Sequence, residues 1–177
     1  MEKDTVDRIL EQWAEERPDL DASPMGVFGR LTRAKEALDR SLSRTFKRFG
    51  LHGGEFDVLA TLRRSGEPYS LTPTELYRST MRSSGAMTNR LDRLEGRGLV
   101  RRSRDPGDRR GVLISLTEEG LELIEEAVEA HVEGEERLLG SLSGEDRARL
   151  AALLRELLVS MEGSESGESK PSGVLRE

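Results

Sequence analysis

Apolar side chains recur at helical spacing along most of this chain. The first stripe covers residues 4–16 and consists of Val6, Ile9, Leu10 and Trp13. Pro18 ends that helix, because a proline disfavours helix in the residue before it. A long helix is predicted over residues 24–49, with Ser23 as its N-cap and Gly50 as its stop. At ~1.5 Å per residue it would span about 39 Å, so we expect part of it to pack on a second chain.

The middle of the chain alternates short helices with strands. A helix over residues 55–64 is followed by a capping box, Thr72-Pro73-Thr74-Glu75, which opens a helix over 73–79. Ser83 is the expected cap of a helix over 84–96. Strands are predicted over 99–104 and 112–116, because Asp105-Pro106-Gly107-Asp108 is strong turn chemistry between them.

Two further helices complete the pattern. Thr117 caps a helix that runs to about Leu139, with glutamates in its first turn, where the helix dipole favours acids. Ser143 begins a last helix, which carries an apolar stripe as far as Met161. From Gly163 the Ser, Glu and Gly composition predicts a disordered tail. The fold class is therefore mainly α with a small β-hairpin.

Charge is segregated along the chain in a way that the net value of −6 hides. Between Arg63 and Arg110 there are twelve arginines and six acids, so this segment is +6 and the remainder is −12. Residues 118–136 hold nine glutamates and no Lys or Arg. Such a chain presents one basic face to a polyanion and repels it elsewhere. The alternative is an unevenly charged, solvated helical surface.

The remaining composition excludes several classes of protein. There is no cysteine, which excludes disulfides, thiolate metal sites and cysteine-based redox sensing. Two histidines far apart in sequence do not suggest a metal site, and no cofactor is predicted. No apolar run approaches the ~18 residues of a membrane span. The N-terminus lacks a signal-peptide pattern, from which we expect a cytoplasmic protein.

The capped helix, tight turn and second helix are the parts of a helix-turn-helix, and the hairpin after them acts as a wing. The second helix of such a motif offers its N-terminal residues to base edges in the major groove. The candidate base-reading residues are Arg82, Ser83, Ser84, Thr88 and Asn89, with Gly85 allowing close approach. Arg93 and Arg97 are expected to reach the phosphate backbone. At the tip of the wing Arg109 and Arg110 are candidates for the minor groove, with Asp108 orienting one of them.

This stretch resembles the MarR family of winged-helix transcription regulators. The resemblance covers roughly residues 29–161 and is most specific in "SSGAMTNRLDRLEGRGLVRR" and "DPGDRRGVLISLTEEG". It implies a dimer built from the N- and C-terminal helices, which reads a palindromic double-stranded operator. The implied organisation is an extra N-terminal helix and linker (1–22), a dimerisation region (23–50 and 117–161), a DNA-binding lobe (51–116) and the tail (162–177).

The extra N-terminal helix and "ERPDLD" are similar to the urate-responsive branch of this family and its PecS- and TamR-like relatives. That resemblance implies a ligand site formed by Trp13, Asp57, Arg64 and Arg90, which would take a small anion, either urate or a related purine, or a tricarboxylate. Asp57 and Arg64 are seven apart on one helix and share a face. In the free protein Asp57 is expected to pair with one of the two arginines. The alternatives are core packing for Trp13, a structural salt bridge for Asp57, and a phosphate contact for Arg90.

Three classes of function follow. The first is a ligand-responsive dimeric transcription factor, a repressor in most proteins of this kind. The second is a ligand-independent architectural DNA-binding protein, for which the charge segregation fits equally well. The third, an enzyme, is excluded because the sequence offers no nucleophile–base pair, paired-carboxylate motif or Gly-rich phosphate loop.

Overall fold

The computed structural model describes residues 2–80, 87–108 and 111–167. Within this range the chain forms two compact units, residues 1–135 and 136–177. The first unit starts with α1 (Thr5–Glu16), α2 (Ser23–Arg48) and α3 (Gly53–Arg64). The second contains α7 (Gly144–Gly167), and α6 (Glu118–Leu138) ends inside it.

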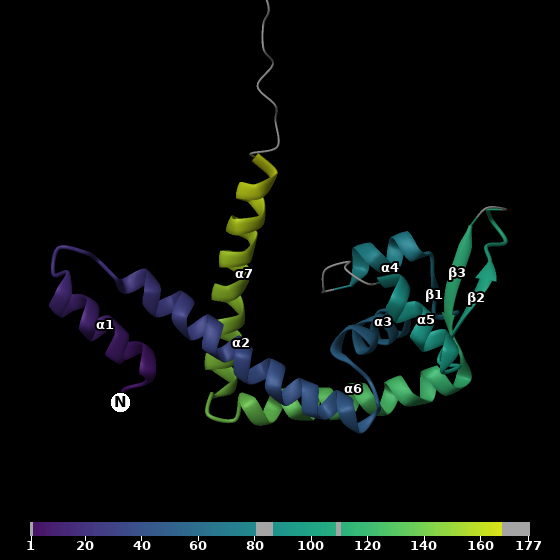
Figure 1. Ribbon diagram of the computed structural model, residues 1–177, viewed down its shortest axis with the longest axis horizontal. Helices are drawn as coiled ribbons and strands as arrows, with labels where there is room; N and C mark the ends of the chain where they lie inside the picture. Colours follow the sequence, from purple (N-terminus) through teal and green to yellow (C-terminus); the bar gives the residue numbers. More distant parts are fainter. Residues whose placement is uncertain (1, 81–86, 109–110, 168–177) are drawn as a thin grey trace, which may run out of the picture. The chain divides into compact units, whose positions relative to one another are not determined.

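The DNA-binding lobe comprises α3 and the elements that follow it as far as β3 (Figure 1). It contains β1 (Ser70–Leu71), α4 (Pro73–Ser79), α5 (Met87–Gly96), β2 (Val100–Arg104) and β3 (Val112–Leu116). The three strands form an antiparallel sheet in the order β1-β3-β2. Helices and hairpin therefore follow one another as the sequence predicted, and the mainly helical fold class with a small β-hairpin is confirmed.

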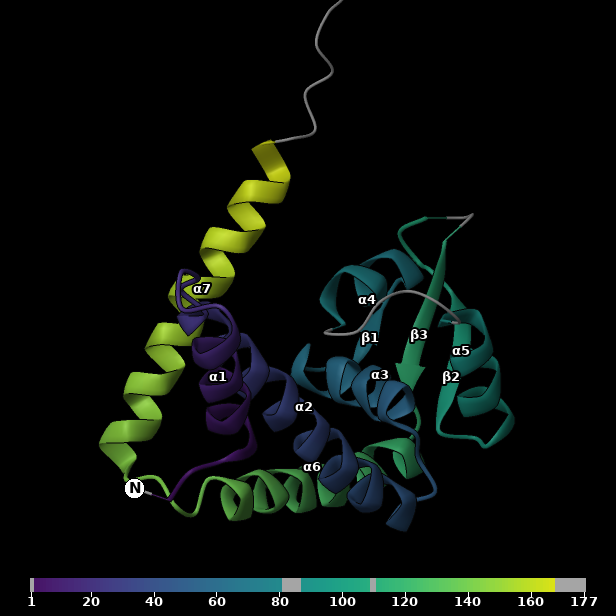
Figure 2. The same cartoon turned by 60° about the vertical axis from the view of Figure 1, so that its left-hand side comes forward.

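The core of the first unit is aliphatic and is shared between the lobe and the helices beside it. Its fully buried side chains include Leu59, Leu62, Leu76, Leu94, Ile114 and Ile124. Phe46 of α2 stacks on Phe56 of α3 with ring centroids 4.4 Å apart, and His131 of α6 lies 4.8 Å from the Phe56 ring. These contacts fix the C-terminal part of α2 against α3 and α6, next to the lobe (Figure 2).

Four expectations about element boundaries change. Ser23 is the first residue of α2 and caps nothing with its side chain; its backbone N–H donates to Asp21 Oδ1 at 2.9 Å. Helix α3 begins two residues earlier than predicted, at Gly53, because His52 N–H donates to Glu55 Oε2 at 2.9 Å and closes the first turn. The last helix continues to Gly167, so residues 162–167 are helical where a tail was expected.

The fourth change is strand β1, which the sequence analysis did not predict. Two residues are too short a stretch to display an alternating pattern. Their pairing depends on β3, where Ser70 faces Ser115 and Leu71 faces Ile114. The Ser70 and Ser115 hydroxyl oxygens lie 2.6 Å apart. This strand therefore forms only because Ser70 pairs with Ser115, which is 45 residues away in the chain.

Of the other predicted caps, Thr117 and Ser143 are confirmed, and Ser83 lies outside the described residues. Gly120 N–H donates to Thr117 Oγ1 at 3.0 Å, and Asp146 N–H donates to Ser143 Oγ at 3.1 Å. Gly50 stands after the C-cap of α2 with φ of 64°, in the left-handed region that glycine adopts without strain. No helix in the described ranges combines the length and apolar character needed to cross a membrane.

Candidate nucleic-acid interface and effector site

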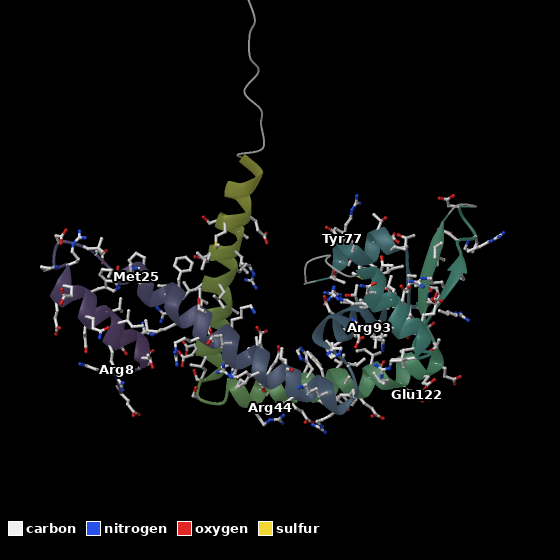
Figure 3. The ribbon with its side chains drawn as sticks, in the orientation of Figure 1. Arg8, Met25, Arg44, Tyr77, Arg93 and Glu122 are labelled. Atoms are coloured by element: carbon white, nitrogen blue, oxygen red, sulfur yellow. The ribbon has the colours of Figure 1, made fainter. Side chains whose placement is uncertain are left out.

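The first helix of the helix-turn-helix is fixed by the predicted capping box. Glu75 N–H donates to Thr72 Oγ1 at 3.2 Å, and Thr72 N–H donates back to Glu75 Oε2 at 2.8 Å. The hydrogen bond from the Thr72 backbone lowers the pKa of the Glu75 carboxyl. Leu76 is fully buried on the inner side of α4, whereas Tyr77 is exposed on the outer side of the same helix (Figure 3). The capping box therefore sets which side of α4 faces outward.

The recognition helix α5 exposes the two predicted base-reading residues that the structure describes, Thr88 and Asn89. Leu91 and Leu94 are buried on its other side and hold α5 against the lobe. The remaining candidates at this end, Arg82, Ser83, Ser84 and Gly85, lie outside the described residues. Small and polar side chains at Thr88 and Asn89 fit the N-terminal part of a helix that enters a groove.

Arg93 and Arg97, expected at phosphates, make contacts within the protein. Arg93 Nε lies 3.2 Å from Glu55 Oε1, and Arg97 Nη1 donates to the Gly50 carbonyl at 2.8 Å. Gly50 lies between α2 and α3, and Glu55 lies in the first turn of α3. The sequence offered no signal for these contacts, because the partners lie far apart along the chain.

The wing is a regular antiparallel pair from Val100–Leu116 to Arg104–Val112. Its turn is closed by Asp105, whose backbone N–H donates to the Gly111 carbonyl at 3.0 Å and whose Oδ1 accepts from Gly107 N–H at 2.8 Å. Asp108 is exposed beside this turn. Arg109 and Arg110 lie outside the described residues, so their expected position at the tip stays a prediction.

Arg102, which the sequence reasoning did not single out, joins the wing to the recognition helix. Its guanidinium bonds Asp92 Oδ1 at 2.6 Å and also pairs with Glu95, both on α5. The hydrogen bond to Asp92 raises the pKa of Arg102 above its usual value. This contact ties the wing to the recognition helix and neutralises two acids that would repel phosphate. The spacing of Asp92 and Glu95 on one helical face was the available signal.

Contacts within the protein engage many of the arginine side chains counted in the sequence. Of the arginines between residues 63 and 110, nine are described. Five of these bond other parts of the protein: Arg63, Arg64, Arg93, Arg97 and Arg102. Within the described residues, Arg78, Arg90, Arg101 and Arg104 have side chains without a hydrogen bond or ion pair. Fewer arginine side chains are therefore free to reach a phosphate than the sequence count indicates.

Three of the four predicted ligand residues lie along one face of α3. Asp57 and Arg64 both belong to α3, and Arg90 of α5 packs over Gly54, one turn before Asp57. A Cβ built on Gly54 would come within 2.5 Å of Arg90 Nε, so the guanidinium group occupies that space. Arg64 Nη2 donates to the Ser79 carbonyl at the end of α4. Both arginines therefore touch helices of the helix-turn-helix.

The expected ion pair between Asp57 and an arginine is wrong. Arg64 is directed to the end of α4, and Arg90 lies over Gly54. Asp57 Oδ2 is buried and accepts no hydrogen bond from any described residue. A buried carboxylate oxygen in this position is a hydrogen-bond acceptor that lacks a donor.

Trp13, the fourth predicted ligand residue, does not join this cluster within one chain. It lies on α1, which packs on the N-terminal half of α2, far along the ribbon from α3 (Figures 1 and 2). Arg30 of α2 holds α1 there through ion pairs with Asp4 at 2.9 Å and Asp7 at 2.6 Å. Trp13 is 37% exposed, so core packing does not describe it either.

Large apolar side chains are exposed on α1 and on the two helices predicted for dimerisation, α2 and α7. On α1 and α2 they include Ile9, Met25, Val27 and Phe28, of which Phe28 is 50% exposed. On α7 they include Leu150, Leu153, Leu158 and Val159. An apolar surface of this kind is typical of a protein–protein interface.

The fold and these contacts define a winged helix-turn-helix protein with its recognition helix and wing tied together. A sequence profile of the MarR family matches residues 49–111. The HTH-type transcriptional regulator PecS of Dickeya dadantii is 47% identical over 149 residues, which cover 84% of this chain and 90% of that protein. The chain therefore belongs to the MarR family and is a DNA-binding transcription regulator.

Two solved structures extend the comparison. Sco3205, a MarR-family regulator from Streptomyces coelicolor in complex with DNA, has a TM-score of 0.73 at 27% identity and covers 82% of this chain and 92% of its own. BpsR of Bordetella bronchiseptica, whose DNA binding is regulated by 6-hydroxynicotinic acid, has a TM-score of 0.66 at 29% identity and covers 74% and 91%. The predicted family and fold are confirmed.

Proposed function

We propose that this regulator is a homodimeric repressor that binds a palindromic operator and is released by a small anionic effector. The observation that carries the effector response is the position of Arg90. It belongs to the recognition helix, yet it packs on the same face of α3 as Asp57 and Arg64. An anion that pairs with Arg64 and Arg90 would shift both side chains. It would thereby act on the end of α4 and on α5 at the same time. It releases DNA if it binds the DNA-free arrangement more tightly.

The chemistry of Asp57 narrows the effector. Its buried Oδ2 lacks a donor among the described residues, and a ligand with N–H groups would supply one. Urate and related purines carry both N–H donors and a negative charge. A fully ionised tricarboxylate carries the charge but would place carboxylates beside Asp57. A flat heterocyclic anion is therefore favoured, in keeping with the compound that regulates BpsR.

Dimerisation is supported by the exposed apolar side chains of α1, α2 and α7. A two-fold dimer presents two recognition helices to two half-sites, about one DNA turn apart, and so reads a palindrome. Trp13 enters the effector site only if a second copy brings its α1 there. Where the operator overlaps a promoter, a bound dimer blocks transcription, and its release by the effector restores transcription.

The test is a fluorescence-anisotropy titration with DNA from beside the protein's own gene and an excess of random competitor. It is repeated with urate and with trans-aconitate. We expect specific binding, at least about 10³-fold over random DNA, that urate abolishes. Release by trans-aconitate alone would contradict the proposed role of Asp57. Equal competition by random DNA would favour a ligand-independent architectural protein.

Arg64→Lys isolates the effector contact. Lysine still offers a donor to the Ser79 carbonyl, but it lacks the planar fork that binds an anion through two hydrogen bonds. DNA binding should stay near wild type, while the effector concentration for half-release rises about tenfold. The matched control is Arg44→Lys, at an exposed position on α2. A wild-type half-release concentration for Arg64→Lys would remove Arg64 from the site.

A further inference from the structure

Recognition helix α5 and the residue after it place three arginines on the connection between α2 and α3. Arg90, Arg93 and Arg97 are spaced three and four residues apart, so they share one helical face. The connection comprises residues 49–55 and is called the α2–α3 junction below. It joins the long helix proposed for dimerisation to the DNA-binding lobe.

Arg97 forms hydrogen bonds at the C-terminal end of α2. Its Nη1 donates to the Gly50 carbonyl at 2.8 Å, and its Nη2 donates to the Phe49 carbonyl at 3.4 Å. Phe49 is the C-cap of α2, where the last carbonyl groups of a helix carry partial negative charge and favour a cation. Arg97 N–H also donates to the Arg93 carbonyl at 3.1 Å, which continues the turn of α5. The Arg97 side chain therefore joins the ends of two helices.

Arg93 forms an ion pair at the N-terminal end of α3. Its Nε lies 3.2 Å from Glu55 Oε1, and Glu55 is only 3% exposed. The other carboxylate oxygen of Glu55 accepts the His52 N–H at 2.9 Å, at the first turn of α3. Since a buried carboxylate needs its partner, Glu55 holds Arg93 through Nε, while the Arg93 side chain as a whole is 56% exposed. Figure 3 shows Arg93 beside α3 and α5.

We propose that Arg93 and Arg97 are positioning residues that set the recognition helix relative to α2 through the α2–α3 junction. Any change in the angle between α2 and α3 moves the Phe49 and Gly50 carbonyls and Glu55. Because Arg97 and Arg93 of the α5 segment are bonded to these groups, α5 moves as well. The two arginines act on DNA through the orientation of α5, and they make no phosphate contact. This inference rests on the proposed function for its link to the effector.

Salt dependence separates positioning from phosphate contact. A lost phosphate contact lowers the slope of log K against log salt by about 0.9 and weakens specific and random DNA alike. For Arg97→Ala we expect about tenfold weaker specific binding, an unchanged slope and unchanged binding of random DNA. Arg44→Ala is the control, because it removes the same charge from α2, away from α5 (Figure 3). A slope that falls by about one would overturn the proposal, and so would wild-type specific binding.

Glu55→Gln supplies a second variant that cannot act on phosphate directly, because residue 55 is buried. It weakens the hold on Arg93 and should reduce the preference for specific over random DNA. Unchanged preference would contradict the proposed role of Arg93.

Hydrogen–deuterium exchange on the DNA-free protein tests the same contacts without an operator. Arg97→Ala should speed amide exchange in α5 and in the last turn of α2, while Arg44→Ala leaves both unchanged. Unchanged exchange in α5 would overturn the proposal. Wild-type protein that fails to select DNA contradicts the proposed function alone, because the exchange result stands by itself.

Discussion

Replacing Gly54 by alanine separates the stability of α3 from the position of Arg90. Gly54 is the second residue of α3, and a Cβ there would lie 2.5 Å from Arg90 Nε and 2.7 Å from Cζ. Ordinary contact begins at 3.4 Å, so the guanidinium must move by about 1 Å. The atoms that must move, Nε and Cζ, belong to the flexible side chain of Arg90. The fold therefore tolerates the change, but Arg90 leaves its place on α3.

The expected energies are small and opposed. Alanine in place of glycine gains about 0.5 kcal/mol in a helix, and a forced side-chain rotation costs of the order of 1 kcal/mol. Net stability should stay within about 1 kcal/mol of wild type, or roughly 2–4 °C in Tm for a chain of this size. The functional change is larger, because a displaced Arg90 can no longer pair with an effector at the same place. We expect the half-release concentration to rise about tenfold, equivalent to ~1.4 kcal/mol.

Thermal unfolding by circular dichroism and anisotropy with specific DNA measure the two effects on one preparation. Gly144→Ala is the matched control, since Gly144 is also in the first turn of a helix and a Cβ there meets nothing within 4 Å. Wild-type DNA affinity together with a wild-type half-release concentration in Gly54→Ala would refute the reasoning that Arg90 works from this position. A loss of more than about 3 kcal/mol of stability would show that movement of the Arg90 side chain alone does not remove the clash with the added Cβ.

Three further outcomes are expected. Gly120→Ala should destabilise the first unit by about 3 kcal/mol in urea unfolding, because a Cβ would lie 1.9 Å from the Leu99 carbonyl oxygen; an unchanged midpoint would contradict that packing. The lowered pKa of Glu75 means that its cap stabilises fully above the ordinary carboxyl range and is lost as pH falls through the lowered value. The Tm deficit of Glu75→Gln should therefore shrink as the pH is lowered below the ordinary carboxyl range, and a deficit that stays constant there would exclude ionisation as its cause. Leu153 is 55% exposed on α7, so Leu153→Glu should yield monomers by light scattering with its helix content retained; a dimer of wild-type mass would exclude α7 from the interface.

The structure brings three of the four predicted ligand residues together for a simple physical reason. Asp57 and Arg64 were placed on one face by helical periodicity alone, and the structure keeps them on the same face. Arg90 joins them because α5 packs over Gly54. Trp13 does not, because α1 is held on the N-terminal half of α2 by Arg30. A residue's helical face follows from its neighbours in sequence, but the meeting of two helices does not.

The sequence by itself determined the order of the helices, the capping box of α4, the turn of the wing and the family. These features depend on residues within a few positions of one another, where periodicity, capping and turn chemistry act. Only the tertiary structure decided which arginines remain available to DNA. Arg97 meets the Gly50 carbonyl across 47 residues of chain, and a count of charges along the sequence cannot register such a contact. Strand β1, and the lack of a donor to Asp57 Oδ2 among the described residues, likewise depend on which groups folding brings close.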